Sequence, residues 1–465
     1  MNSLSIFGTS SDAGKSTLSF AITYLLHHRG IKVAPFKAQN VSNNSKVCDD
    51  GGEIAIPQHF AAEAIGIKTS HFMNPILIKS GFQNSAHLII NGKAVGEKDT
   101  IQYYEDIDTL KPHAKKAFKK LLKEYECIVA EGAGSPVELN LMDKDLSNIY
   151  IADTFNTKII LVADIERGGV FASIVGVYAL LPEKLRKNVL GVIINKFRGD
   201  MRLFYDGVHI IEERFGIKVL GVVPYKAFNL GFEDSQSLMN YTQDTKNALI
   251  RVGVIRLPHI SNFTDFEPLV ADGEIELSFI SNPSEVSTCQ ILILPGSKRV
   301  VDDLAWLRER GFCEHLLSHE KTIIAICGGY EMMFERLLDP WHVESEQKEV
   351  SGLGRLKGDV VFAQEKIVQK GCYRVFRTMV EGYEIHNAVA KKRVKRKKNL
   401  YGTFIHGIFE SDALREKIFS EVDSRYKGYC FKDYKTKAIT DFTSHVSEHV
   451  DIDFIESELR NDREA

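Results

Sequence analysis

Several features that would place this chain in a special class of protein are absent from its sequence. Its seven cysteines are scattered and include no Cys-x-x-Cys pair, which argues against a zinc site or a disulfide framework and favours a reducing compartment. No apolar run approaches the roughly 18 residues that span a bilayer. The opening MNSLSIFGTS has no basic region followed by an apolar stretch, unlike a signal peptide. We therefore expect a soluble, cytoplasmic protein.

An excess of charge of one sign is also lacking. The net charge is −3 over 465 residues, so no global field favours nucleic acid. The one dense basic run, KKRVKRKK at 391–398, is interpreted as a solvated loop between two strands, although such clusters also bind phosphates. We expect small-molecule substrates, no nucleic-acid or membrane partner, and leave a homo-oligomer open.

Short apolar runs alternate with longer helix-like stretches along most of the chain. They are rich in Val and Ile without polar alternation, as parallel strands covered on both faces should be. This alternation predicts doubly wound α/β sheets. A first series of predicted strands covers 4–8, 32–36, 127–132, 158–164, 189–195 and 219–224. A second series covers 251–257, 289–296, 322–329 and 401–407.

A polar segment without periodicity, beginning QSLMNYTQDTKNA, separates the two series and predicts a linker over 236–249. A chain of this length is too long for one comfortable domain. We predict an N-terminal P-loop-type parallel-sheet domain over 1–235. A second doubly wound α/β domain is predicted over 250–465.

The stretch GTSSDAGKST follows a predicted strand and begins a predicted helix, the context of a phosphate-binding loop. It has five residues between its glycines, where the usual loop has four. Backbone N–H groups at the helix N-terminus would bind phosphate oxygens, Lys15 would reach the β- and γ-phosphates, and Ser16 would offer its hydroxyl to Mg²⁺. The alternative is an ordinary strand–helix turn. The predicted nucleotide-binding residues here are Gly8, Thr9, Asp12, Gly14, Lys15, Ser16 and Thr17.

A nucleotide site also needs carboxylates that hold a metal, and ligands of doubly wound sheets lie beyond the carboxyl ends of the strands. Glu131 ends one predicted strand and Glu53 follows a Gly-rich turn, so both join Ser16 as candidate Mg²⁺ ligands. Asp164, at another strand end, is a further candidate, although a single acidic residue there is more often a cap. Lys37 closes the second predicted strand and would steady a transferring phosphate.

The second domain carries different chemistry. In IIAICGGYEMM, Cys327 stands where a buried strand turns sharply into a helix, as at a nucleophile elbow, and a helix N-terminus favours the thiolate. The N–H of Gly328, with a second glycine turn at Gly296, would stabilise a tetrahedral oxyanion. His406, at the end of another strand, is the predicted base. The alternative for Cys327 is a buried structural thiol.

Each domain resembles a known class of enzyme. The phosphate loop resembles that of dethiobiotin synthetase and its relatives, which phosphorylate a carboxylate for attack by nitrogen. INKFRGD resembles their base-contacting segment, which implies that Asn195 contacts the base. The second domain resembles class I glutamine amidotransferases, which implies a flavodoxin-like sheet. In those enzymes a glutamate two residues after the histidine orients it. Here that position is Ile408 and the nearest acid is Glu410, so a backbone carbonyl is a candidate partner of His406.

One set of stretches spans both domains, from residue 8 to about 410: GTSSDAGKST, APFKAQNVSNNS, DGGEIAIPQ, HFMNPILIK, EGAGSPVELNL, VADIERGGVFAS, GVIINKFRGD, LPGSKRVVDDLAWLRERGF, AICGGYEMM, GYEIH and YGTFIHGIFE. As a set they resemble the cobyric acid synthase family of cobalamin biosynthesis. The resemblance implies ATP- and glutamine-dependent amidation of the b, d, e and g carboxylates of (adenosyl)cobyrinic acid a,c-diamide through acyl phosphates. It weakens at Ile56 and Pro57 and is poor within 340–400.

Three alternatives share parts of these patterns. A corrinoid a,c-diamide synthase has both domains but acts on the two other carboxylates, and FKAQN and NPILIK favour the first family. CTP synthase has a similar arrangement of two domains but keeps the His-x-Glu pair. A partition-type P-loop switch ATPase would carry a second lysine early in the loop, where Ser11 and Asp12 stand, and would lack a Cys–His domain.

Overall fold

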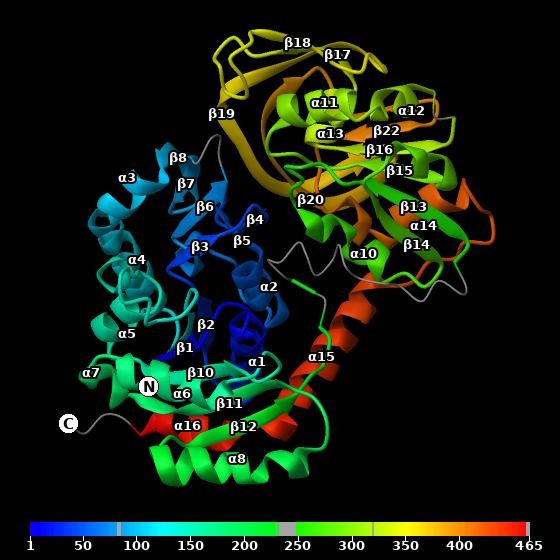
Figure 1. Ribbon diagram of the computed structural model, residues 1–465. Coiled ribbons are helices and arrows are strands. Elements are labelled where there is room, and N and C mark those ends of the chain that lie inside the picture. The colour runs from blue at the N-terminus through cyan, green and yellow to red at the C-terminus, as the bar shows by residue number, and fades with distance from the viewer. Residues whose placement is uncertain (81–84, 229, 232–247, 319, 462–465) are drawn as a thin grey trace. The chain divides into compact units, whose positions relative to one another are not determined.

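The computed structural model describes residues 1–80, 85–228, 230–231, 248–318 and 320–461 (Figure 1). The chain forms two compact units, each of which takes in more than one segment. Unit 1 comprises Met1–Ser42, Cys48–Glu233 and Thr436–Ala465, and unit 2 comprises Asn43–Val47 and Asp234–Lys435.

These units differ from the predicted domains at two places. The segment Asn43–Val47 is part of unit 2, although the chain on both sides of it belongs to unit 1. The segment Thr436–Ala465 is part of unit 1, because its helices pack on the N-terminal sheet rather than on the second one. Most of the predicted linker, 236–249, lies outside the described residues.

Unit 1 is built on a parallel six-stranded sheet with the order β12-β11-β10-β1-β9-β2. Its strands are almost entirely buried, as their Val- and Ile-rich composition predicts, because helices cover both faces. The strands are β1 (Leu4–Gly8), β2 (Val33–Phe36), β9 (Cys127–Glu131), β10 (Lys158–Asp164), β11 (Val189–Phe197) and β12 (Val219–Pro224). The helices are α1 (Lys15–His28), α2 (Ile56–Ala64), α3 (Thr100–Glu105), α4 (Ile107–Leu121), α5 (Ile149–Phe155), α6 (Val170–Leu180), α7 (Glu183–Arg186), α8 (Tyr205–His209) and α16 (Ile452–Arg460).

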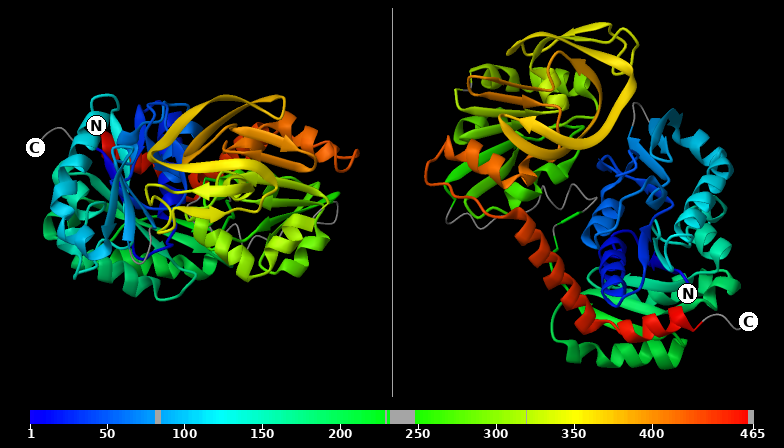
Figure 2. Two further views of the ribbon diagram at one scale, coloured as in Figure 1. Left: turned by 90° about the horizontal axis from the view of Figure 1, so that it is seen from above. Right: turned by 180° about the vertical axis from the view of Figure 1, so that it is seen from behind.

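A smaller four-stranded sheet completes unit 1, with the order β3-β6-β7-β8. Its strands are β3 (Gln39–Val41), β6 (Ile76–Ser80), β7 (Ser85–Ile90) and β8 (Lys93–Asp99). The start of the chain contacts helix α16 in this unit (Figure 2): the Asn2 N–H donates to the Leu459 carbonyl at 2.9 Å. Helix α16 is thereby tied to the strand that leads into the phosphate loop.

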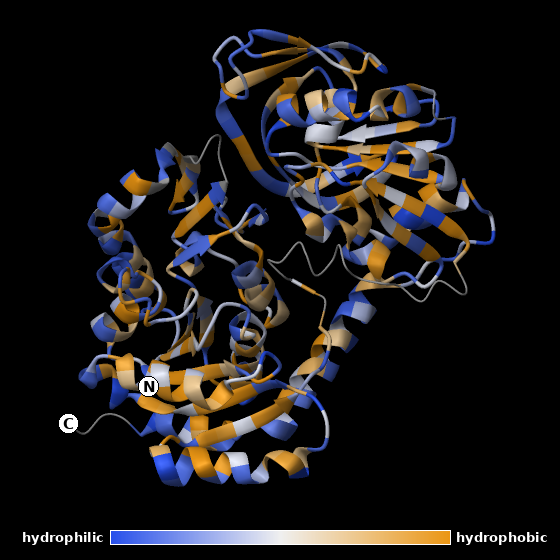
Figure 3. Cartoon of the chain, in the orientation of Figure 1, coloured by the Kyte–Doolittle hydropathy of each residue, from blue (hydrophilic) through white to orange (hydrophobic). Residues whose placement is uncertain are grey.

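Unit 2 contains a second six-stranded sheet, with the order β14-β13-β15-β16-β22-β21. Its first five strands are parallel in the flavodoxin-like order, which confirms the predicted fold class. In Figure 3 these strands are largely hydrophobic, whereas the helices beside them carry both hydrophobic and hydrophilic residues. The strands are β13 (Ile250–Ile255), β14 (Ile275–Ile280), β15 (Ile291–Leu294), β16 (Thr322–Ile326), β21 (Val394–Lys397) and β22 (Leu400–Thr403). The helices are α10 (Glu267–Val270), α11 (Val300–Glu309), α12 (Phe312–Ser318), α13 (Gly328–Met332) and α14 (Asp412–Ser420).

The basic run at 391–398 is not simply a loop, as the sequence suggested. Its residues Val394–Lys397 form β21, which pairs antiparallel with β22 at the edge of the sheet. Charged side chains on an edge strand discourage pairing with another chain, so the run has a structural explanation.

A long antiparallel pair was not predicted at all. Strands β19 (Leu356–Val375) and β20 (Thr378–Ala390) join β17 (Phe334–Leu338) and β18 (Glu349–Ser351) in a four-stranded sheet of unit 2. These strands lie where the resemblance to the family is poor. Among the described residues, no helix is long and apolar enough to cross a bilayer.

Candidate functional site

The phosphate-loop sequence lies where it was expected, between β1 and α1. Gly14 is the N-cap residue of α1 and has a positive φ of 93°. A Cβ atom at this position would lie 2.1 Å from Asn195 Nδ2, so the turn accepts only glycine. The Lys15 ammonium donates to the Ser10 carbonyl at 3.1 Å, which folds the side chain back over the loop.

Side chains from β11 and from α1 hold this loop in shape. Asn195 Nδ2 donates to the Ala13 carbonyl at 2.9 Å, and Lys196 Nζ donates to the Asp12 carbonyl at 2.5 Å. The structure thus places Asn195 against the loop, and its contact with a nucleotide base stays a prediction. Thr17 Oγ1 donates to the Gly14 carbonyl at 2.9 Å, which ties the first turn of α1 to the loop.

Glu131, at the carboxyl end of β9, has a buried carboxylate that accepts hydrogen bonds from three side chains. Its Oε1 accepts from Ser16 Oγ at 2.7 Å and from Lys37 Nζ at 2.8 Å. Its Oε2 accepts from Gln58 Nε2 at 3.2 Å. The structure therefore brings together three predicted residues: Glu131 at the end of β9, Lys37 just after β2, and Ser16 in the first turn of α1. Sequence reasoning missed Gln58, which stands on α2 with only its proximity to Glu53 as a signal.

The other two acidic candidates have partners of their own. Glu53, on β5 (Glu53–Ala55), is fully buried and ion-paired with Lys79. Asp164 accepts from the Glu166 N–H at 2.7 Å and pairs with Lys196 at 3.0 Å.

In unit 2, Cys327 stands between β16 and α13 in the strained backbone of a nucleophile elbow. Its φ is 49° and its ψ is −114°, a conformation that costs a non-glycine residue energy and persists only when surrounding contacts enforce it. Its N–H donates to the Thr403 carbonyl at 2.8 Å. A Cβ atom at Gly329 would lie 2.2 Å from the Leu294 carbonyl oxygen, which explains one of the two glycines after the cysteine.

The catalytic pair predicted from the sequence shares one buried environment. The Cys327 thiol points to the Ile385 carbonyl at 3.8 Å. His406 is completely buried, and its ring stacks on Tyr383 at a centroid distance of 5.3 Å. A Cβ atom at Gly296 would lie 3.1 Å from His406 Cε1, so the predicted oxyanion turn also reaches this site.

A carboxylate, not a backbone carbonyl, contacts the histidine. His406 Nδ1 lies 2.7 Å from Asp265 Oδ2, and Asp265 Oδ1 accepts from the Gly407 N–H at 2.7 Å. Burial opposes a charge on the imidazole, but Asp265 and Cys327 outweigh it and raise the pKa of His406 to about 10. Sequence reasoning missed Asp265 because it stands on η5 (Phe263–Phe266), far from the histidine in the chain. Glu410, the nearest acid in sequence, is instead paired with Lys46 at 2.8 Å.

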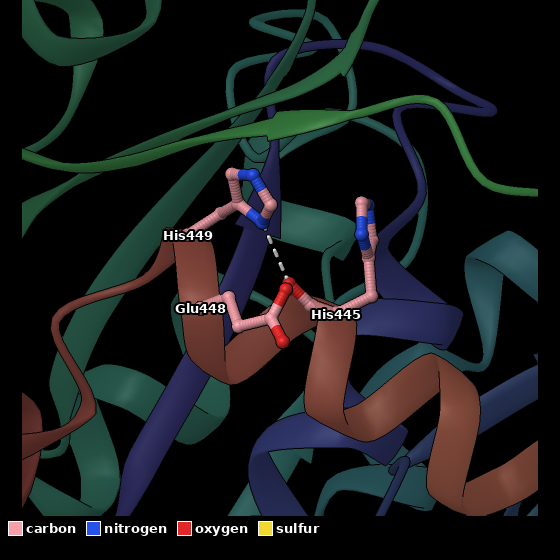
Figure 4. Close-up of side chains that lie close together, drawn as sticks. All are labelled: His445, Glu448 and His449. Atoms are coloured by element: carbon pink, nitrogen blue, oxygen red, sulfur yellow. Dashed lines mark hydrogen bonds between the residues drawn. The ribbon is translucent and has the colours of Figure 1, made fainter.

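A separate cluster of His445, Glu448 and His449 has the spacing of metal ligands on the C-terminal helix α15 (Phe431–His449; Figure 4). One ring is engaged by β12, because His445 Nε2 donates to the Pro224 carbonyl at 2.8 Å. The other is engaged by its own helix, because His449 Nδ1 donates to the His445 carbonyl at 2.8 Å. The His445 bond attaches α15 to β12 of unit 1, and the His449 bond is internal to the helix.

Comparison with known proteins matches both parts of the chain. Residues 4–232 match the CobQ/CobB/MinD/ParA nucleotide binding domain, and residues 251–414 match the CobB/CobQ-like glutamine amidotransferase domain. The chain is 52% identical to a cobyric acid synthase of Acinetobacter baylyi, over 98% of both chains. It is 39% identical to one of Listeria monocytogenes, over 90% of this chain and 88% of that one. A cobyric acid synthase of Clostridium perfringens is 37% identical over 99% of both chains.

Proposed function

The chain belongs to the cobyric acid synthase family of cobalamin biosynthesis, and from this we propose that it amidates the b, d, e and g carboxylates of (adenosyl)cobyrinic acid a,c-diamide. The observation that carries the proposal is the presence, in one chain, of a phosphate loop beside Glu131 and of a Cys–His pair beside Asp265. Glutamine supplies the nitrogen and ATP the activation. A cytoplasmic location is part of the proposal, since both co-substrates are metabolites of that compartment.

The first unit carries the activation step. A carboxylate does not react with ammonia at neutral pH, because oxide is a very poor leaving group. A carboxylate oxygen of the corrinoid attacks the γ-phosphorus of ATP, ADP leaves, and an acyl phosphate forms. Ammonia then attacks the acyl carbon, and phosphate leaves as the amide forms. The loop N–H groups, Lys15 and Lys37 neutralise the charge that develops on the phosphoryl oxygens.

The oxygens of Ser16 and Glu131 suit a bound Mg²⁺. They lie 2.7 Å apart, near the separation of about 3 Å between adjacent ligands of an octahedral Mg²⁺ with its short bonds. When bound, the ion would offset the charge of the β- and γ-phosphates. Glu53 is fully buried and ion-paired with Lys79, whereas Glu131 contacts Ser16 at the phosphate loop directly, so we assign the ion to Ser16 and Glu131.

The second unit carries the release of ammonia. The Cys327 sulfur attacks the side-chain amide carbon of glutamine, its proton passes to His406 Nε2, and the same nitrogen then protonates the departing ammonia. A glutamyl thioester remains, which water hydrolyses to glutamate. Asp265 holds the Nδ1 proton and so keeps Nε2 available. The N–H groups of Gly296 and Gly328 would stabilise the tetrahedral oxyanion.

The substitution Cys327→Ser tests this division of labour. It keeps the volume of the side chain but replaces the thiolate with a hydroxyl, a far weaker nucleophile beside a histidine. We expect glutamine to stop serving as nitrogen donor, while a high concentration of ammonium at mildly alkaline pH still yields amide. The measurement is amide formation followed by mass spectrometry with either donor.

Two results would contradict the proposal. Undiminished use of glutamine would show that Cys327 is a core thiol. Loss of amide formation with both donors, in a variant whose circular dichroism matches the parent, would show that the two chemistries are not separable.

A further inference from the structure

The segment Asn43–Val47 is the one part of the chain before residue 234 that belongs to unit 2. Two consecutive residues of this segment contact the loop that precedes Asp265. Asn44 Oδ1 accepts from the Phe263 N–H at 3.1 Å, and the Ser45 N–H donates to Asn262 Oδ1 at 3.4 Å. The segment is therefore attached to the stretch that carries the partner of the catalytic histidine.

The next two residues of the segment contact the other elements around His406. Lys46 is ion-paired with Glu410, four residues after the histidine, at 2.8 Å. Val47 packs in a buried apolar cluster with Tyr383 and Ile385 of β20. Tyr383 stacks on the His406 ring, and the Ile385 carbonyl faces the Cys327 thiol. These four contacts thus involve residues that lie next to the catalytic pair or on the same turns.

Asn262 links the segment directly to the base. Its Nδ2 lies 3.2 Å from His406 Nε2, and Asn262 has a positive φ of 56°, so its backbone is held in an uncommon conformation. The Ser45 backbone N–H can only donate a hydrogen bond, so the side-chain oxygen of Asn262 must face it. The NH₂ group must then face His406 Nε2. Asp265 already occupies Nδ1, so Nε2 is the nitrogen that has to receive the Cys327 proton.

We propose that residues 43–47 form a coupling segment, which controls glutamine hydrolysis by setting the orientation of the Asn262 amide at His406. With the segment in place, the Asn262 NH₂ group faces Nε2 and opposes the proton that this nitrogen takes up from Cys327. When the segment shifts, the amide turns and offers its oxygen to Nε2–H. That oxygen stabilises the imidazolium that forms when Cys327 loses its proton. Asn262 is a positioning residue in this scheme.

The chain itself suggests what moves the segment. Lys37, which contacts Glu131 in the candidate nucleotide site, precedes Asn43 by only six residues and is joined to it through β3. Binding of ATP and the acceptor at that site would therefore bear on the segment by direct continuity of the backbone. Coupling of this kind requires that the ligands favour one of two arrangements of the segment. The inference rests on the proposed function.

The test compares glutamine hydrolysis with and without ATP and the corrinoid, in the parent and in Asn44→Ala. The parent should be stimulated by the two ligands. Asn44→Ala should hydrolyse glutamine about 5-fold faster than the parent without them, the lower end of ordinary coupling between two sites, and its stimulation ratio should fall accordingly. Asn262→Asp, whose carboxylate offers Nε2 only acceptors, should show the same direction of change. Lys46→Gln serves as a milder second variant if Asn44→Ala does not fold.

Asn282→Ala is the matched control, because Asn282 also lies in unit 2 but its amide contacts Glu285. In this variant ATP and the corrinoid should stimulate glutamine hydrolysis by the same ratio as in the parent. The proposal would be overturned if Asn44→Ala and Lys46→Gln both kept the parental stimulation ratio. It would also be overturned if hydrolysis in these variants fell equally with and without the ligands, or if the ligands did not stimulate the parent. Amide formation from ammonium should stay at the parental rate in Asn44→Ala. A parent that forms no amide from ammonium would instead overturn the proposed function.

Discussion

His406 Nδ1 and Asp265 Oδ2 lie 2.7 Å apart, although 141 residues separate them in the chain. The contact arises because β13 and β22 are parallel strands of one sheet, so the turns that follow them meet at the same edge. Asp265 follows the first of these strands and His406 follows the second. A carboxylate at Nδ1 fixes the tautomer of the imidazole and leaves Nε2 as its reactive nitrogen.

Asp265→Asn should therefore impair glutamine hydrolysis while amide formation from ammonium persists. The amide keeps the size of the side chain but removes its charge, so the imidazolium loses its partner and the wrong tautomer becomes accessible. We expect kcat with glutamine to fall about 100-fold or more. Steady-state kinetics with glutamine and with ammonium measure the two activities. An unchanged kcat would mean that Asp265 only supports the Gly407 backbone.

The same ion pair predicts a pH dependence of stability. Because the pKa of His406 is raised to about 10 in the folded state, its pairing with Asp265 stabilises the fold fully below the ordinary histidine pKa. That contribution is lost as the pH rises through the folded value. Asp265→Asn should reduce the free energy of unfolding by about 3 kcal/mol near pH 6, and the difference should shrink toward pH 10. Urea denaturation at several pH values measures it, and a difference independent of pH would contradict the ion pair.

Lys15→Ala should abolish ATP-dependent amidation and leave glutamine hydrolysis without ATP measurable. The two chemistries belong to different units, and a cation that stabilises transferring phosphate is worth about 10²- to 10³-fold in rate. ADP release and glutamate release can be followed in parallel on one sample. Normal amidation by this variant, with ATP consumed, would remove the loop from the mechanism.

Glu131→Gln should weaken the use of Mg²⁺ more than the binding of the corrinoid, since it removes charge but preserves shape. We expect the Mg²⁺ concentration for half-maximal activity to rise about 10-fold. Asp164→Asn is the informative comparison, because Asp164 also ends a strand but pairs with Lys196. A larger shift in Asp164→Asn than in Glu131→Gln would mean that the metal ligand lies at the other strand.

The sequence by itself determined the features that depend on neighbouring residues. A short local pattern of apolar residues, glycines and a helix start is enough to predict three features. These are the parallel strands of both large sheets, the turn of GTSSDAGKST into α1, and the Cys-Gly-Gly elbow. Such patterns constrain the backbone wherever they occur, because sterics and hydrogen bonding within a few residues dictate them. The alternation of strands and helices predicted that the second sheet is doubly wound, and the resemblance to glutamine amidotransferases implied its flavodoxin-like order.

Only the tertiary structure decided which distant side chains meet. Three contacts join elements whose proximity depends on the order of the strands, and no local spacing in the sequence encodes them. They are the contacts of Asp265 with His406, of Gln58 with Glu131 and of Lys79 with Glu53. The same holds for the segment 43–47, which follows a strand of unit 1 but packs in unit 2. A side chain's neighbours in sequence limit its conformation, whereas its partner is whichever group the folded sheets bring within hydrogen-bonding distance.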